Sequence, residues 1–341
     1  MIPLSAYERS LQEFLKPIAS LLADASVSEI MINHANEIYA ERKGQLTRCS
    51  ACFPSNEALT RALRNIAQYL GRSFDDEHPI LEGHLPDGSR IEALLPPIAA
   101  AGPAVAIRRF SRNKLTLPRL IEVGALSFEA ARFLGRAVAD KKNIIIAGGT
   151  GSGKTSLLNA LSGLIAPTER VIVLEDAREL QLQGEHVLQL GVRPKDSAGR
   201  GEVTMRDLFK ATLRLRPDRI VIGEIRGGES LDLIQAMTSG HGGCLSTVHA
   251  SHPCDALARL ETMALMSDVR LPLHALRSQI ASAIDLVVQI TRHGDGRRGI
   301  THICKVEPCT EGGDYKLHVL FELGQSGALT AAAAQQGNLA L

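Results

Sequence analysis

One octapeptide constrains this chain more than any other stretch, Gly148-Gly149-Thr150-Gly151-Ser152-Gly153-Lys154-Thr155, which has the form G-x-x-x-x-G-K-T. The apolar run 143–147 precedes it and predicts a buried parallel strand, while 156–162 has the apolar spacing of a helix packed on a sheet. A strand, a glycine loop and a helix N-terminus together direct several backbone N–H groups and the positive end of a helix dipole at an anion. The sequence therefore predicts a nucleotide triphosphate site.

Each position of this loop has an expected task. We expect Lys154 to reach the β- and γ-phosphates of ATP and the Thr155 hydroxyl to ligate Mg²⁺. The glycines allow the main chain to close on the phosphates, and Ser156 is grouped with the loop as a nucleotide contact. The alternative, a glycine-rich turn with a chance lysine, does not account for the complete octapeptide and both of its flanks.

Composition and charge narrow the class of protein. With 341 residues the chain is long enough for two domains, and 45% hydrophobic with 22% charged residues is ordinary for a soluble globular protein. A formal net charge of +1 favours no nucleic-acid partner. No segment approaches the roughly 20 apolar residues that span a bilayer, and the N-terminus lacks the pattern of a signal peptide. We therefore expect a cytoplasmic protein.

The cysteines do not predict a metal site. The chain has six, and their spacing to one another and to the histidines matches no standard zinc pattern. The expectation is buried free thiols in a reducing compartment.

The hydrophobic periodicity predicts two domains and a tail. Residues 1–110 read as a smaller α/β domain, with helices expected over 10–22 and 55–69, and 111–125 form a polar, basic linker. Strands alternate with helices over 126–323, which predicts a doubly wound α/β domain closed by a hairpin around 311–314. The segment 324–341, rich in Ala, Gln and Gly, is expected to be a flexible tail.

Two acidic stretches follow apolar runs downstream of the loop. Glu175 and Asp176 end the run 171–174, at the strand edge where ligands of open α/β sheets bind. Glu175 is our candidate for polarising the water that attacks the γ-phosphate, the alternative being a helix-capping pair on a surface turn. Glu224 ends the run 220–223 in the manner of a Walker B segment and is expected to hold Mg²⁺ directly or through water.

Two histidines bracket the next short apolar run. His241 lies in Ser239-Gly240-His241-Gly242-Gly243, and His249 ends Ser246-Thr247-Val248-His249. A lone histidine is usually structural, but this pair after two acids predicts sensors of the γ-phosphate.

Together these motifs resemble the secretion ATPase superfamily of type II and type IV secretion and type IV pili. Its Asp box, Walker B and His box resemble Glu175-Asp176, Gly223-Glu224-Ile225-Arg226 and Gly240-His241…Thr247-Val248-His249. Within that superfamily the chain resembles the CpaF type, the motor of tight-adherence (Flp) pili. The matching stretches are 85–90, 107–110, 177–182, 227–229 and 280–285.

The resemblance implies a RecA-like ATPase domain behind a smaller, PAS-like N-terminal domain, assembled as a homo-hexamer that hydrolyses ATP with Mg²⁺. The implied partner is an inner-membrane platform protein, so the chain is expected at the cytoplasmic side of that membrane. Arginines of the N-terminal domain are implied to approach the γ-phosphate; Arg90 and Arg108 are the candidates, each with a surface salt bridge as its alternative. Arg109 lies on the opposite strand face from Arg108.

Other functions stay open from the sequence. A closely related ATPase of a conjugative or effector-exporting type IV system carries nearly the same motifs. A nucleotide-gated regulator that binds ATP without hydrolysis is disfavoured by the intact acids, and a helicase or recombinase by the charge balance.

Overall fold

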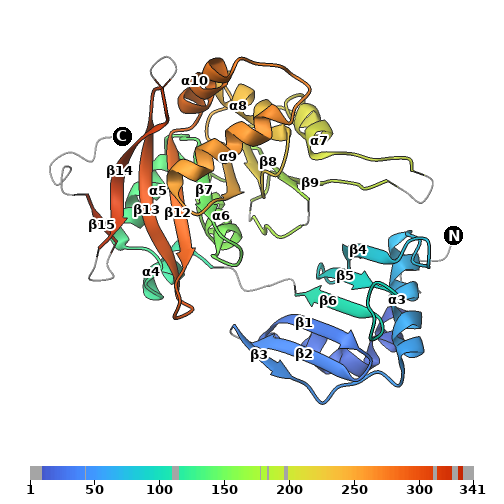
Figure 1. Ribbon diagram of the computed structural model, residues 1–341. Helices are drawn as coiled ribbons and strands as arrows, with labels where there is room; N and C mark the ends of the chain where they lie inside the picture. The colour runs from blue at the N-terminus through green and yellow to red at the C-terminus, as the bar shows by residue number, and fades with distance from the viewer. Residues whose placement is uncertain are drawn as a thin grey trace. The chain divides into compact units, whose positions relative to one another are not determined.

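The computed structural model describes residues 10–42, 44–109, 115–176, 178–182, 184–195, 199–309, 313–324 and 329–332. The chain divides into two compact units, one comprising Met1–Asn113 and Pro194–Glu202, the other Lys114–Arg193 and Val203–Leu341 (Figure 1). The start of the predicted linker, at 111–114, lies outside the described residues. So do 311 and 312 of the predicted hairpin turn and most of the predicted tail.

The described part of the first unit is a six-stranded antiparallel sheet in the order β3-β2-β1-β6-β5-β4. The central strands bury apolar side chains in one core that they share with the helices of this unit. The strands are β1 (Val27–His34), β2 (Glu37–Arg42), β3 (Gln45–Arg48), β4 (Ile80–His84), β5 (Arg90–Leu94) and β6 (Ala104–Arg108).

The helices of the first unit begin and end where local chemistry requires. In α3 (Asn56–Leu70) the Ser55 hydroxyl accepts the Ala58 N–H at 3.2 Å and so caps the N-terminus of the helix. The helix predicted over 10–22 is not continuous, because the chain tightens into the 3-10 turn η1 (Lys16–Ile18) before α2 (Ala19–Ala23). Pro17 explains the interruption, since proline has no N–H for an intrahelical hydrogen bond.

The second unit is built on a nine-stranded sheet, counted within the described residues, in the order β15-β14-β13-β12-β7-β11-β10-β8-β9. The strands from β12 to β9 in that order run parallel, and β13, β14 and β15 extend the sheet beyond β12, each antiparallel to its neighbour. The parallel strands are β7 (Ile144–Gly148), β8 (Val171–Glu175), β9 (Val187–Gly191), β10 (Arg219–Ile222), β11 (Leu245–His249) and β12 (Leu286–Arg292), and the others are β13 (Arg298–Glu307), β14 (Lys316–Leu323) and β15 (Leu329–Ala331).

Helices cover both faces of this sheet, so the unit has two apolar cores. On β7, Ile144 and Ile146 face one core while Ile145 and Ala147 face the other, as strand alternation requires. One face carries α4 (Leu117–Glu122), α5 (Phe128–Ala139) and α6 (Lys154–Ser162); the other carries α7 (Met205–Thr212), α8 (Glu229–Thr238), α9 (Pro253–Leu265) and α10 (Leu273–Ala283).

The structure adds three strands that the periodicity did not predict. β3 has every residue exposed and β9 has every residue half-buried, so neither shows the alternation that marks a strand in sequence. β15 lies within the segment predicted to be a flexible tail, where it pairs with β14 at one edge of the sheet.

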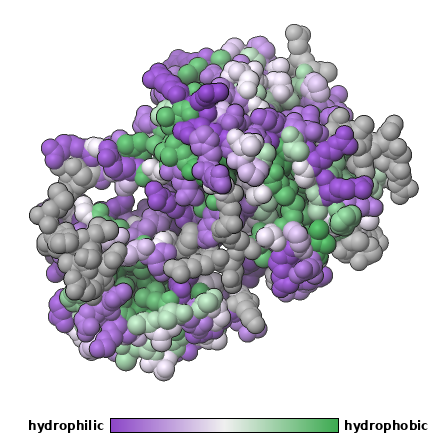
Figure 2. Space-filling model, turned by 180° about the vertical axis from the view of Figure 1, so that it is seen from behind, coloured by the Kyte–Doolittle hydropathy of each residue, from purple (hydrophilic) through white to green (hydrophobic). Residues whose placement is uncertain are grey.

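The face in Figure 2 is mostly hydrophilic, with hydrophobic residues in separate groups. Within the described ranges, no helix is both long and apolar enough to cross a bilayer. All six cysteines are free; Cys244 and Cys304 are buried as expected, whereas Cys52 and Cys254 are exposed, contrary to the expectation of buried thiols.

Candidate functional site

The predicted phosphate loop connects β7 to α6 at the carboxyl edge of the parallel sheet. Gly151 and Gly153 have φ angles of 68° and 104°, which favour glycine. A Cβ at Gly148 would lie 2.4 Å from the Ile290 carbonyl oxygen, so the strand leaves no room for a side chain there. The Ser152 hydroxyl donates to the Gly149 carbonyl at 2.9 Å and braces the turn. The loop thus has the local geometry of an anion cradle at a helix N-terminus.

Lys154, the first residue of α6, points across the loop toward β11. It is only 8% exposed, and its Nζ donates to the Gly149 carbonyl at 3.0 Å and lies 3.3 Å from His249 Nδ1. The parallel register of β7 and β11 brings this about, because it places His249 beside Gly148. The structure therefore brings the predicted lysine and one of the two predicted histidines together.

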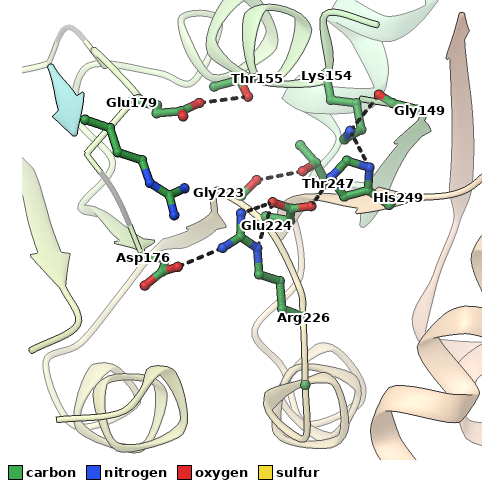
Figure 3. A network of polar contacts seen from close by, with 12 residues as sticks. Gly149, Lys154, Thr155, Asp176, Glu179, Gly223, Glu224, Arg226, Thr247 and His249 are labelled. Carbon is green, nitrogen blue, oxygen red and sulfur yellow. Dashed lines mark hydrogen bonds and ion pairs between the residues drawn. The ribbon is translucent and has the colours of Figure 1, made fainter. Parts of the chain in front are cut away.

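Glu224 follows β10 and joins the same cluster from its other side (Figure 3). Its Oε1 lies 2.6 Å from His249 Nε2, and its Oε2 accepts from Arg226 Nε at 2.9 Å and Nη2 at 2.6 Å. Arg226 also donates to Asp176 Oδ2 at 2.8 Å. A continuous polar chain thus runs from Lys154 through His249 and Glu224 to Arg226 and Asp176.

The surroundings of His249 favour its neutral form. Burial lowers its pKa, and the nearby Lys154 ammonium lowers it further. The contacts assign the tautomer: Nδ1 accepts from Lys154, so Nε2 carries the proton that faces Glu224.

Glu175, the last residue of β8, is turned into the protein. It is 2% exposed, and its Oε1 accepts the backbone N–H groups of Glu179 at 2.9 Å and Leu180 at 2.7 Å. Its Oε2 is buried without a hydrogen-bond partner within the described part of the chain. Burial raises the pKa of Glu175 to about 7. In this conformation the carboxyl group organises the turn after β8, and its free oxygen does not reach solvent.

Glu179 is the functional candidate that the sequence analysis missed. Its Oε2 accepts from the Thr155 hydroxyl at 3.3 Å, so it contacts the residue predicted to ligate Mg²⁺ (Figure 3). The sequence held one signal for it, an acid four residues after Glu175 within 177–182, a stretch that matches the CpaF type and follows the pair that resembles the Asp box. The turn that Glu175 fixes is what presents Glu179 to the loop.

His241 is not brought to this cluster. It precedes β11, whereas His249 ends it, and β11 runs parallel to β7. Because a strand of this length spans roughly 13–17 Å, the two histidines lie at opposite edges of the sheet. Thr247 is a residue that the sequence analysis did not single out: its hydroxyl donates to the Gly223 carbonyl at 2.7 Å, next to Glu224.

The candidate arginines lie on the sheet of the first unit. Arg90 on β5 and Arg108 on β6 are directly opposite one another, and Arg90 is paired with Glu82. Arg108 is exposed and has no ion pair with any described residue. Arg109 donates to the carbonyls of Leu21 and Asp24 at 3.0 and 3.1 Å and so tethers the turn before β1.

The donor set at the loop suits Mg²⁺ bound together with a nucleotide. Within the described residues, no group of three or more His, Cys, Asp or Glu side chains forms a metal site. Thr155 and Glu224, with Glu179, instead offer one hydroxyl and two carboxylates. Mg²⁺ in nucleotide sites is held by few protein oxygens because phosphates and water complete its shell. The residues therefore fit this metal.

Fold and site together define a RecA-like α/β protein with a phosphate-binding loop. The family model for Type II/IV secretion system proteins matches residues 12–310, so the chain belongs to that family. Conjugal transfer protein TrbB of Rhizobium radiobacter is 38% identical over 296 residues, covering 85% of this chain and 87% of TrbB. Type IV secretion system protein PtlH of Bordetella pertussis is 34% identical over 317 residues, covering 85% of this chain and 93% of PtlH.

Solved structures confirm the predicted fold class. The Legionella pneumophila ATPase DotB superposes with a TM-score of 0.59 at 21% identity, covering 84% of this chain and 79% of DotB. The ADP-bound pilus retraction motor PilT gives a TM-score of 0.57 at 16% identity, covering 93% of this chain and 84% of PilT.

Proposed function

We propose that the chain is a Mg²⁺-dependent ATPase that powers a type IV secretion or conjugative transfer system. The observation that carries the proposal is the polar chain at the carboxyl edge, which links the phosphate-loop lysine to the acid after β10 through a neutral histidine. Family membership and relatives such as TrbB and PtlH support the biological setting.

Different residues bind the phosphates, hold the metal and connect these two groups. The loop amides and Lys154 bind and neutralise the phosphates, and Thr155 and Glu224 hold the metal. Bound Mg²⁺ supplies further positive charge at the β- and γ-phosphates. His249 couples Lys154 to Glu224, so a change in the lysine's contacts is transmitted to the acid.

Glu179 is the better-placed carboxylate for activating water. It is partly exposed and touches Thr155, whereas the free oxygen of Glu175 is buried. A general base must reach the proton that it removes. The role that the sequence suggested for Glu175 therefore passes to Glu179 in our proposal, with Glu175 as its positioning residue.

The proposal also includes the oligomeric state of the protein and its partner. We expect a homo-hexamer on the cytoplasmic face of the inner membrane, with an integral membrane platform protein as its partner. Arg90 and Arg108 are retained as the arginines that offset charge on the γ-phosphate, and hydrolysis is expected to drive rigid-body movement of the domains.

A pilus motor of the tight-adherence (CpaF) type is the second candidate. The motif stretches named above favour it, while relatives such as TrbB and PtlH favour transfer and secretion. Deleting the gene distinguishes the two: loss of surface pili with intact transfer supports the pilus motor, and the reverse supports the transfer ATPase.

Phosphate release by the purified full chain tests the activity. We expect hydrolysis that requires Mg²⁺ and is lost in Lys154→Ala, while the melting temperature of that variant stays near wild type. A wild-type chain that binds ATP without releasing phosphate, alone or with its platform protein, would show a nucleotide-gated regulator instead.

A further inference from the structure

Two arginines face each other next to the turn of the β12–β13 hairpin. Arg292 ends β12 and Arg298 begins β13, and the two are directly opposite in the antiparallel register. Residues directly opposite in such a pair project from the same face, where like charges repel. The face is the one that Ile290 and Ile300 bury against the core containing α6.

The pair lies beside the phosphate loop. The position that a Cβ would take at Gly151 is 3.8 Å from Arg292 Nη1, and the same position at Gly153 is 3.8 Å from Arg298 Cδ. Gly153 is also the N-cap of α6, so the two guanidinium groups are near the positive end of a helix dipole. Cations at a helix N-terminus are unfavourable without an anion.

No carboxylate of a described residue forms an ion pair with either arginine. Both arginines are exposed, and neither makes an ion pair or a side-chain hydrogen bond with another described residue. The acid of the same hairpin, Asp295, is engaged by Arg297, whose Nε lies 2.6 Å from Asp295 Oδ2. Two opposed cations at a helix N-terminus thus form a positive site for an anion.

The order of the strands indicates which part of a bound nucleotide would lie beside these two arginines. Lys154 and Glu224 reach the loop from the β11 and β10 side of β7, while β12 lies on the other side of β7. A polyphosphate with its terminal phosphate at Lys154 and Glu224 therefore extends its ester end toward the hairpin. Arginine suits that end, because its planar guanidinium pairs with phosphate oxygens through two hydrogen bonds.

We propose that Arg292 and Arg298 bind the α-phosphate end of the nucleotide held by the loop. This rests on the proposed nucleotide site and adds two residues to it that the motifs do not contain. The hairpin fixes the end of the substrate that ATP and ADP share, while Lys154, Glu179 and Glu224 act on the end that distinguishes them.

Calorimetric titration of the full chain with MgADP and with a non-hydrolysable ATP analogue tests the proposal. In the double variant Arg292→Gln/Arg298→Gln we expect both ligands to bind at least about tenfold more weakly. The factor should be the same for both, because the lost contact is to the end that the two nucleotides share. The melting temperature of the nucleotide-free variant is expected not to fall, since two opposed cations are removed. Arg297→Gln is the matched control: it removes one cation of the same hairpin and leaves both affinities at the wild-type value.

Each other result has its own meaning. Wild-type affinity for MgADP in the double variant overturns the inference while leaving the nucleotide site intact. A loss confined to the ATP analogue also overturns it, because the arginines would then act at the γ-phosphate end. A loss that Arg297→Gln reproduces shows only a general charge effect, and a changed oligomeric state with unchanged affinities shows that the pair meets an acidic protein partner. If the wild-type chain binds neither ligand, the proposed function itself has failed.

Discussion

Glu169 and Glu175 flank the same strand, β8, yet their surroundings shift their pKa values in opposite directions. Glu169 precedes the strand at the amino edge of the sheet, where hydrogen bonds from Arg219 lower its pKa to about 2. Glu175 ends the strand at the carboxyl edge, where burial raises its pKa to about 7. The two acids are the same residue type near the two ends of one strand, so the difference comes from what lies at each edge.

The amino-edge cluster is satisfied by the protein itself. The Arg219 side chain is fully buried; its Nε and Nη2 bond the two oxygens of Glu169 at 2.8 and 3.2 Å, and Nη2 also reaches the Val138 carbonyl at 2.6 Å. The carboxyl-edge cluster is less complete: one Glu175 oxygen has no hydrogen-bond partner among the described residues, and Arg226, which holds Glu224, is half exposed. We infer that the first edge holds the sheet together, while the second keeps polar groups available for a ligand.

The largest expected effect is on turnover at the carboxyl edge. We expect Glu179→Gln to lower kcat by at least about 100-fold, within the range for a lost general base. MgATP binding and the melting temperature should stay near wild type, because Glu179 is partly exposed. Glu175→Gln is the matched comparison, since its amide oxygen still accepts the two backbone N–H groups; we expect less than about a tenfold loss. If single-turnover measurements reverse this order, Glu175 is the base.

The next effect is on stability at the amino edge. Arg219→Met leaves Glu169 without its buried partner, and breaking such a pair costs about 3–5 kcal/mol in free energy of unfolding. Urea denaturation measures the loss. The fraction that stays folded should hydrolyse ATP at nearly the wild-type kcat, because the mutated residue is at the far edge from the loop. A destabilisation below about 1 kcal/mol would remove the contrast between the two edges.

This contrast also explains which residues of the candidate site could be predicted from the sequence and which could not. The phosphate loop and Glu224 were predictable because each is a local pattern at the end of an apolar run. His241 and His249 look equivalent in sequence, since they bracket one run, but a parallel strand sends them to opposite edges. Glu175 and Glu179 could not be ranked, because which carboxylate is buried depends on the backbone turn after β8.

The missed features of the fold have similar causes. β3 and β9 lack the alternating burial that marks a strand, so only their pairing with neighbours reveals them. The buried role of Arg219 depends on contacts from residues about 50 positions earlier and on a carbonyl in α5. Such contacts leave no mark in local periodicity, whereas the alternation of strands and helices in the second unit does.

A third effect is the pH dependence of unfolding that the two acids impose. When the pKa of a group is higher in the folded than in the unfolded protein, the group stabilises the fold fully at pH values below its unfolded-state pKa. That contribution is lost as the pH rises through the folded-state pKa. For Glu175 the window runs from the ordinary value of 4.5 to about 7, so wild type should lose up to about 3 kcal/mol relative to Glu175→Gln across it. Glu169 acts with the opposite sign, since its stabilisation is lost as the pH falls from 4.5 toward 2. Urea titrations of both proteins from pH 4 to 8 measure the difference, and parallel curves would contradict the burial of Glu175.

The smallest effect isolates burial from charge at the amino edge. Lys141 lies 2.9 Å from Glu169 Oε2, the same oxygen that Arg219 Nε contacts, but its side chain is 50% exposed. An exposed ion pair contributes about 0–1 kcal/mol, so Lys141→Met should lower the free energy of unfolding by no more than that. Because both cations contact one oxygen, the difference between Lys141→Met and Arg219→Met measures what burial and the further hydrogen bonds of Arg219 add to the pair. Equal losses in the two variants would mean that charge alone stabilises this edge, and the satisfied amino edge would then not differ in kind from the carboxyl edge.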